Sequence, residues 1–372
     1  MRAYSAANEE ALQARALLKD WAGEGFLSKA QYDQMQQETV CDLRRTNIFL
    51  RVVMFFFTVI IVGAVVGLFF AGSGSGGVLI LFAGIAYFAA EVAASKGFYR
   101  YGFEEAFLVC SVGLLCVGVE SLMRGEFLVG AIGAIASLWI WHRFGLAYAF
   151  FGAMIFSFWF ASHAAPGRDS QHWMVAGVYL VGLMTVASVR VRYSLTFLNE
   201  RFSIAEAMLW LGVYVALNLE LGSWLGYSSG PAGVSRVLFW TSWVLIWCIP
   251  PVVLFRGLKQ KDRFVIWVGG LTVILTLATN KSYLGWERHT WDPMLLGALL
   301  VGVALCLQRW LGKGVRNGYT AQRLSGQDKA WMSIVSAAAG VASQHAPQHS
   351  TGSETHFGDG GTSGGAGASS DF

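Results

Sequence analysis

Residues 48–70 read IFLRVVMFFFTVIIVGAVVGLFF, an apolar run in which Arg51 is the only charged residue. The hydrocarbon core of a bilayer is roughly 30 Å thick and a helix rises about 1.5 Å per residue, so about 20 apolar residues are needed to cross it. This run is long enough for one crossing. It therefore predicts a membrane-spanning α-helix.

Apolar runs of similar length, separated by short polar breaks, continue as far as Leu311. Hydrophobic residues make up 55% of the chain and charged residues 13%, whereas soluble domains carry about 25% charged residues. Because the bilayer core offers no water, each crossing segment must satisfy its backbone groups internally, as a helix does. We predict an all-α fold, a polytopic transmembrane helix bundle of about ten spans. The predicted spans are Ile48–Phe70, Gly77–Ala94, Ala106–Met123, Phe127–Trp141, Gly145–Ala161, Trp173–Val189, Ile204–Leu221, Val237–Phe255, Phe264–Thr279 and Met294–Leu311.

The fourth and fifth predicted spans are joined only by His142-Arg143-Phe144, and the fourth span is short. If the two formed a hairpin that does not cross fully, the number of crossings would fall by two. The later helices would then keep their direction. The sequence leaves this alternative open.

The lysine and arginine residues indicate how the chain is threaded through the membrane. When the amino terminus and every second loop are assigned to one side, that side holds 22 of the 27 basic residues. Loops rich in Lys and Arg favour the cytoplasmic side, so we predict that both termini are cytoplasmic. Insertion and contact with anionic lipid heads account for the net charge of +4 without a nucleic-acid partner.

The amino-terminal residues 1–47 predict a cytoplasmic helical hairpin. Its second helix starts at Ser28, and Gln31 three residues later completes a capping box. Two interpretations are equally favoured. In one, residues 1–45 dock a protein partner or the membrane surface; in the other, the hairpin packs on the protein's own cytoplasmic loops.

The rest of the chain divides by composition. Residues 48–311 form the predicted transmembrane bundle, and residues 312–345 a cytoplasmic segment with a short amphipathic helix. Residues 346–372 are rich in Gly and Ser and cannot bury enough apolar surface to offset the entropy of ordering. They therefore predict a disordered tail.

Several short motifs near the two ends carry a resemblance. Residues 21–32 read WAGEGFLSKAQY, residues 291–297 read WDPMLLG, and residues 317–321 read NGYTA. With these motifs and its glycine-rich tail, the chain resembles a group of uncharacterised bacterial polytopic membrane proteins that open with a short cytoplasmic helical segment. The resemblance implies a multi-pass protein of the bacterial cytoplasmic (inner) membrane, and the group carries no established activity.

No catalytic, nucleotide-binding or metal-binding motif interrupts the apolar pattern, so we expect no enzymatic activity, no cofactor and no metal. An ionisable residue within a span is by default a functional hypothesis. Five such residues are present, and each lies within about one turn of a predicted interface, where a long side chain can reach water. We therefore expect structural roles for them. They are Arg51, Glu91, Glu120, Glu206 and Glu220.

A polar cluster is predicted on the outer side of the bundle. Glu120 ends the third span, Asn218 and Glu220 end the seventh, and Arg288 lies in an outer loop. If these side chains converge, they form a shallow polar vestibule. Such a vestibule would be a candidate binding site.

The spans contain a proline pair and a glycine pair that affect helix geometry and packing. Pro250 and Pro251 interrupt the eighth span and each removes a backbone donor, so a kink or an unwound turn is expected there. Broken helices at membrane depth occur at transporter sites. Gly63 and Gly67 form a small-xxx-small pattern, for which we favour internal helix packing over dimerisation.

Two functions follow from these observations. The leading hypothesis is an integral membrane protein without enzymatic activity that acts through helix packing and partner contacts, because its polar features lie at its ends. The alternative is a secondary transporter of a small solute that uses the span broken at Pro250-Pro251 and the outer polar cluster.

Overall fold

The computed structural model describes most of the chain up to residue 283. In these residues every regular element is helical. Of the predicted tenth span, Met294–Leu311, it describes only single residues, and the predicted segments 312–345 and 346–372 lie outside the described residues. The described residues are 2–23, 25–39, 43, 46–73, 75–193, 199–224, 230–283 and seven residues between 294 and 309.

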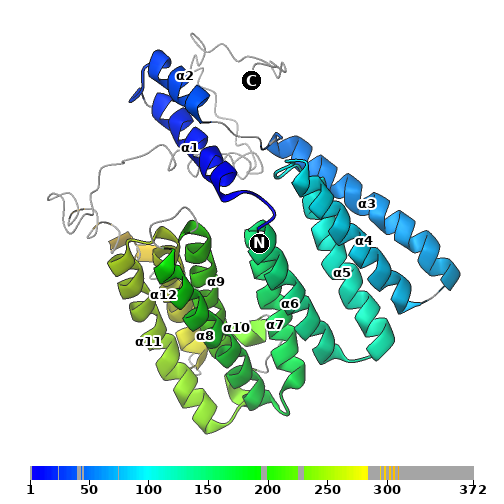
Figure 1. Ribbon diagram of the computed structural model, residues 1–372. Helices are drawn as coiled ribbons and strands as arrows, with labels where there is room; N and C mark the ends of the chain where they lie inside the picture. The colour runs from blue at the N-terminus through cyan, green and yellow to red at the C-terminus, as the bar shows by residue number, and fades with distance from the viewer. Residues whose placement is uncertain are drawn as a thin grey trace, which may run out of the picture. The chain divides into compact units, whose positions relative to one another are not determined.

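The chain begins with a helical hairpin, α1 (Ala6–Gly23) and α2 (Lys29–Glu38) (Figure 1). The Ser28 Oγ accepts a hydrogen bond from the Gln31 backbone N–H at 3.3 Å, and the Gln31 Oε1 accepts one from the Ser28 N–H at 3.0 Å. This reciprocal pair is the predicted capping box, and it satisfies two backbone donors at the start of α2.

In the described part of the chain nine long helices follow, one on each of the first nine predicted spans. The strongest packing joins helices that are neighbours in the chain, so that α4 pairs with α5, α6 with α7, α8 with α9 and α11 with α12. A short helix α10 (Leu219–Trp224) follows α9, and a 3₁₀ turn (Pro231–Gly233) precedes α11. The long helices are α3 (Ile48–Ser73), α4 (Gly76–Ser95), α5 (Phe103–Met123), α6 (Glu126–Phe144), α7 (Ala147–Ala164), α8 (Arg168–Arg192), α9 (Asn199–Leu217), α11 (Arg236–Gln260) and α12 (Arg263–Tyr283).

Eight of these nine helices are long and apolar enough to cross a membrane. The exception is α9, which has 19 residues and a length of about 28 Å but contains Glu200, Arg201 and Glu206. It packs against α7, α8, α11 and α12, and more than half of its residues are buried. Because protein surrounds α9, its charged residues can find partners on other helices.

The predicted fourth and fifth spans form two separate full-length helices. α6 has 19 residues and α7 has 18, so each is about 27–28 Å long. Gly145 ends α6 with φ +72°, a left-handed conformation that turns the chain directly into α7. Each helix is long and apolar enough for a crossing of its own.

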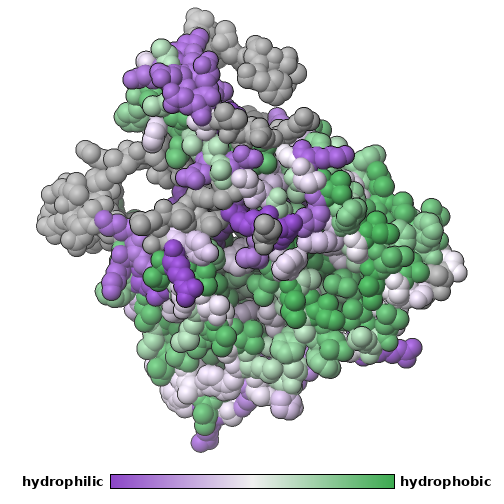
Figure 2. Space-filling view, in the orientation of Figure 1, coloured by the Kyte–Doolittle hydropathy of each residue, from purple (hydrophilic) through white to green (hydrophobic). Residues whose placement is uncertain are grey.

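Large apolar side chains cover the outer surface of the bundle. Phe49 and Leu68 on α3 and Trp267 on α12 are each at least three-quarters exposed, as expected of side chains that face lipid. Figure 2 shows this hydrophobic surface over α3–α5, with hydrophilic residues gathered over the hairpin and the nearby end of the bundle. Among the described residues, no atom of another helix lies within 4 Å of a Cβ built at Gly63 or Gly67, so the described helices show no close packing at this pair.

The helix α11 runs through Pro250 and Pro251 without interruption, so the unwound turn expected there is not observed. The Ile246 carbonyl, four residues before Pro250, loses its partner within the helix because proline has no N–H. The Thr276 hydroxyl on α12 donates to this carbonyl at 3.0 Å. The same hydroxyl lies 2.8 Å from the Thr272 carbonyl of its own helix, so its single hydrogen is shared between the two carbonyls. A hydroxyl from a neighbouring helix thus partly satisfies the backbone group that proline leaves free, as is common in transmembrane helices.

Candidate functional site: the charged end of the bundle

Charged side chains from several helices meet around Glu206, which lies in the second turn of α9 and is fully buried. Its Oε2 accepts a hydrogen bond from Arg190 Nη1 at 2.7 Å, and its Oε1 accepts one from Arg256 Nε. Arg190 lies in the last turn of α8 and Arg256 near the end of α11. Guanidinium groups from two helices therefore hold one carboxylate of a third.

Asp262 extends this arrangement to α12. Its Oδ2 lies 2.6 Å from Arg190 Nη2, and its Oδ1 accepts the Phe264 backbone N–H at 2.9 Å, which caps the start of α12. The Ser203 hydroxyl on α9 also donates to this carboxylate at 2.6 Å. Two positive and two negative charges balance, as buried charges require. We call Arg190, Glu206, Arg256 and Asp262 the Glu206 cluster.

Two further arginine–glutamate pairs join helices of the first half of the bundle. Arg51 on α3 donates to both oxygens of Glu105 on α5, at 2.8 and 2.5 Å. Arg143 on α6 binds both oxygens of Glu91 on α4, at 2.8 and 2.9 Å, and the Tyr87 hydroxyl donates to the same carboxylate at 2.8 Å. Because each arginine contacts both carboxylate oxygens, these pairs fix the relative orientation of the two side chains as well as balancing their charges.

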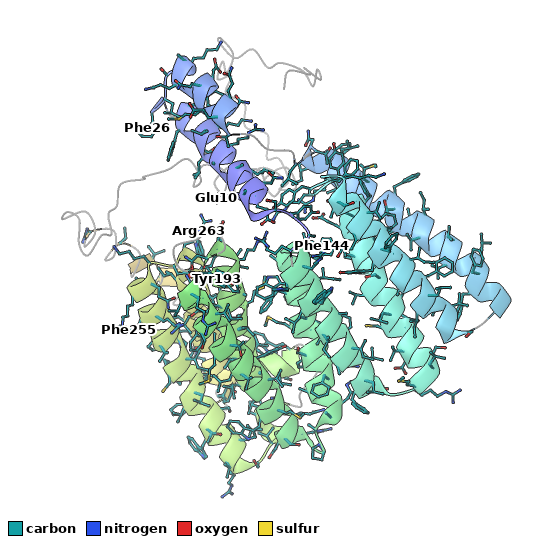
Figure 3. The ribbon with its side chains drawn as sticks, in the orientation of Figure 1. Glu10, Phe26, Phe144, Tyr193, Phe255 and Arg263 are labelled. Atoms are coloured by element: carbon teal, nitrogen blue, oxygen red, sulfur yellow. The ribbon has the colours of Figure 1, made fainter. Side chains whose placement is uncertain are left out.

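The amino-terminal segment contacts this same end of the bundle. The Ala3 N–H donates to the Arg143 carbonyl at 2.8 Å, and the Tyr4 hydroxyl donates to the Phe98 carbonyl at 3.0 Å. Figure 3 labels Phe144 at the end of α6 near the base of the hairpin, and Phe26 at the hairpin's far end. The hairpin is therefore fixed to the bundle at its base.

Glu9 on α1 anchors this base through ion pairs. It is 3% exposed, its Oε1 accepts Arg201 Nη2 at 2.7 Å, and its Oε2 pairs with Arg2. Burial and the neighbouring Arg201 lower the pKa of Arg2, against the opposite effect of Glu9. Burial and then the charge of Glu104 raise the pKa of Tyr4, so its hydroxyl stays protonated and remains a donor.

A cavity of about 350 Å³ lies between α1 and the helix ends of the bundle. Its wall combines apolar, aromatic and charged side chains from the hairpin, from the loop between α4 and α5, and from α6, α7 and α9. We call it the α1 cavity. Its wall includes Leu12 and Ala16 of α1, Tyr99 and Arg100 of the loop, Trp141, Gly145 and Phe150 of the α6–α7 turn, and Glu200, Arg201 and Ile204 of α9.

Glu206 corrects one expectation about the ionisable residues of the spans. Its side chain does not reach water, because it is 0% exposed and two arginines take the place of solvent. The sequence contains a signal for this arrangement, since Arg190 and Arg256 end spans on the side where Glu206 begins one. Which arginine reaches which carboxylate depends on helix packing.

The members of the predicted vestibule have different surroundings. Glu120 is exposed in the last turn of α5, and Glu220 accepts the Trp224 Nε1–H at 2.9 Å. α5 packs on α3, α4 and α6, whereas α10, which carries Glu220, packs on α9 and α12. The described helices therefore do not bring Glu120 to Glu220. Arg288 lies outside the described residues.

Asn218 is fully buried where α9 meets α10. Its Nδ2 donates to the Tyr214 hydroxyl and to Thr279 Oγ1, both at 3.0 Å, and its Oδ1 accepts the Leu221 N–H at 3.1 Å. Tyr214 in turn shares a hydrogen bond of 2.9 Å with Thr276, whose hydroxyl also contacts the Ile246 carbonyl of α11. Asn218 thus belongs to an interhelical hydrogen-bond network.

Among the described residues, no group of three or more His, Cys, Asp or Glu side chains is placed to hold a metal ion. Comparison with known proteins finds no family model that matches this chain and no similar curated protein or solved structure.

Proposed function

We propose that this chain is an integral protein of the bacterial cytoplasmic membrane that acts without catalysis, by presenting its amino-terminal hairpin to a protein partner. In this proposal both termini, and the end of the bundle that carries the arginine–carboxylate pairs, face the cytoplasm. The excess of basic residues in the loops on that side supports this orientation. The bundle then serves as a rigid base for the hairpin.

The observation that carries the proposal is the exposure of the hairpin. α2 buries none of its residues, and Trp21, Phe26 and Met35 are 44%, 70% and 40% exposed. A helix of ten residues is marginal in water unless its apolar side chains are covered, and clustered exposed apolar residues mark interaction sites. The ion pairs of Glu9 hold the base of α1, so these residues are presented at a fixed place.

The carrier hypothesis gains no support from the cavities at membrane depth. Three cavities of about 280–440 Å³ lie between the long helices. Among the residues that the structure describes, each has only one to three polar side chains, which are uncharged tyrosines, serines and one tryptophan. One of them is Tyr179, whose hydroxyl already donates to the Met154 carbonyl at 2.9 Å. A path for a polar solute needs more polar groups than these walls provide.

Photo-crosslinking in cells tests the proposal. A photoreactive phenylalanine analogue at Phe26 should give discrete protein adducts, and Trp21→Ser should remove them while the protein stays in the membrane. The same analogue at Lys261, an exposed position at the same end of the bundle, is the matched control and should give none of these adducts. Adducts to lipid alone at Phe26, or the same adducts from both positions, would overturn it.

A further inference from the structure

We propose that the α1 cavity binds a phosphate-bearing ligand, with Arg100 and Arg201 holding the phosphate. The inference concerns a site that the proposed partner recruitment does not use. It rests on the charge of the cavity wall, on the state of Arg100 and on the position of the cavity.

Arg100 is a cation without a counter-charge among the described residues. Its Nε is buried without a hydrogen-bond partner, and the structure gives its guanidinium no ion pair. It lies over the Tyr99 ring, with its Cζ 5.3 Å from the ring centroid. Leaving a buried donor unsatisfied costs free energy, and a phosphate that accepts from the other guanidinium donors would supply the missing counter-charge.

The surroundings of the cavity carry an excess of positive charge. Arg201 shares the single carboxylate of Glu9 with Arg2, and Glu200 is paired with Arg263 at 2.9 Å. The wall itself carries two arginines, Arg100 and Arg201, and one glutamate, Glu200. The wall is therefore positive, which favours an anionic ligand such as a phosphate.

The backbone brings both arginines to the cavity in unusual ways. Arg100 has φ +58°, a left-handed conformation that side chains other than glycine rarely adopt and that is retained where surrounding structure requires it. Gly145 leaves room for Arg201, because a Cβ at this position would lie 1.7 Å from the Arg201 Nη1. Both features place a guanidinium at the cavity wall.

The position of the cavity indicates which phosphates reach it. Its wall includes the last turn of α6 and the first turns of α7 and α9, so it lies where the long helices end. Lipid headgroups occupy this level, and basic pockets between transmembrane helices bind anionic headgroups. A volume of about 350 Å³ also admits a small soluble phosphate ester. Both sources offer the same phosphate to the arginines.

Ligand-dependent thermal stability of the detergent-purified full chain tests the inference. The probes are dioctanoyl-phosphatidylglycerol, dioctanoyl-phosphatidylcholine, glycerol 3-phosphate and inorganic phosphate. The key variant is Arg100→Gln. Arg124→Gln is its matched control, because Arg124 is also a left-handed arginine (φ +46°) beside α5 but is exposed at the helix's other end.

We expect phosphatidylglycerol or a soluble phosphate to raise the melting temperature saturably, and Arg100→Gln to weaken that binding about tenfold or more. Arg124→Gln should leave it unchanged. Saturation by phosphatidylglycerol but not by glycerol 3-phosphate assigns the phosphate to lipid, and the reverse assigns it to a soluble ester. Ala16→Trp, which narrows the cavity from its exposed rim, should weaken binding even if Arg100→Gln does not fold. Binding of no phosphate probe, or equal binding by all three variants and the wild type, would overturn the inference.

Discussion

Replacing Glu206 by glutamine tests whether the Glu206 cluster holds the second half of the bundle together. The substitution preserves shape but removes the negative charge between Arg190 and Arg256, whose side chains are 10% and 34% exposed. It also places an amide N–H₂ donor against guanidinium donors. Removing one partner of a buried ion pair costs about 3–5 kcal/mol. Because Arg256 is partly solvated, we expect the lower end of that range, about 3 kcal/mol.

The free energy of unfolding can be measured by titrating dodecylmaltoside micelles with sodium dodecyl sulfate and following the fluorescence of the fifteen tryptophans. Glu120→Gln is the matched control, since this exposed carboxylate should change stability by less than about 0.5 kcal/mol. The double variant Glu206→Gln/Arg256→Gln should lose much less free energy of unfolding than the two single variants together, because the two residues interact directly. If Glu206→Gln is as stable as Glu120→Gln, the cluster does not stabilise the bundle.

Three further substitutions test two local features of the structure. Gly145→Ala should lower the free energy of unfolding by about 1–3 kcal/mol, because φ is positive there and the new methyl group displaces Arg201. Proteolysis of the amino-terminal hairpin should then be faster. An unchanged rate of proteolysis would show that Arg201 does not anchor the hairpin. Thr276→Val should cost about 1 kcal/mol, because it removes the hydroxyl that serves the Ile246 carbonyl. In the Thr276→Val background, Pro250→Ala should recover part of that loss by restoring a backbone donor. The same titration measures both effects. If Pro250→Ala changes stability equally with Thr276 present and absent, the Thr276 hydroxyl does not serve the Ile246 carbonyl.

The sequence predicts most helices because lipid contact dictates their composition. α3 needs only a long apolar run, and its observed start at Ile48 is the predicted one. The hairpin is predictable for a different reason, since the Ser28–Gln31 capping box is a local interaction between residues three apart. Hydropathy is a weaker guide to α9, because its charged residues are neutralised by other helices and do not face lipid.

The site is less accessible to sequence reasoning because its contacts are distant in the chain. Glu206 meets Arg190 and Arg256, which lie 16 and 50 residues away. Glu9 meets Arg201, 192 residues away. Charge signs and span ends indicate that such residues share one side of the bundle, but only the packing of helices decides which of them touch. For the same reason, Glu120 and Glu220 share a predicted side without lying together.

The most direct test of the account is the side of the membrane on which the charged helix ends lie. Single cysteines placed in a cysteine-free variant at Lys96, Lys261 and Arg124, all exposed positions, can be labelled with a membrane-impermeant maleimide in spheroplasts and in inverted vesicles. We expect positions 96 and 261 to react only in inverted vesicles, where protease also reaches the hairpin, and position 124 to react only in spheroplasts. Reaction of positions 124 and 261 from the same side would contradict the account.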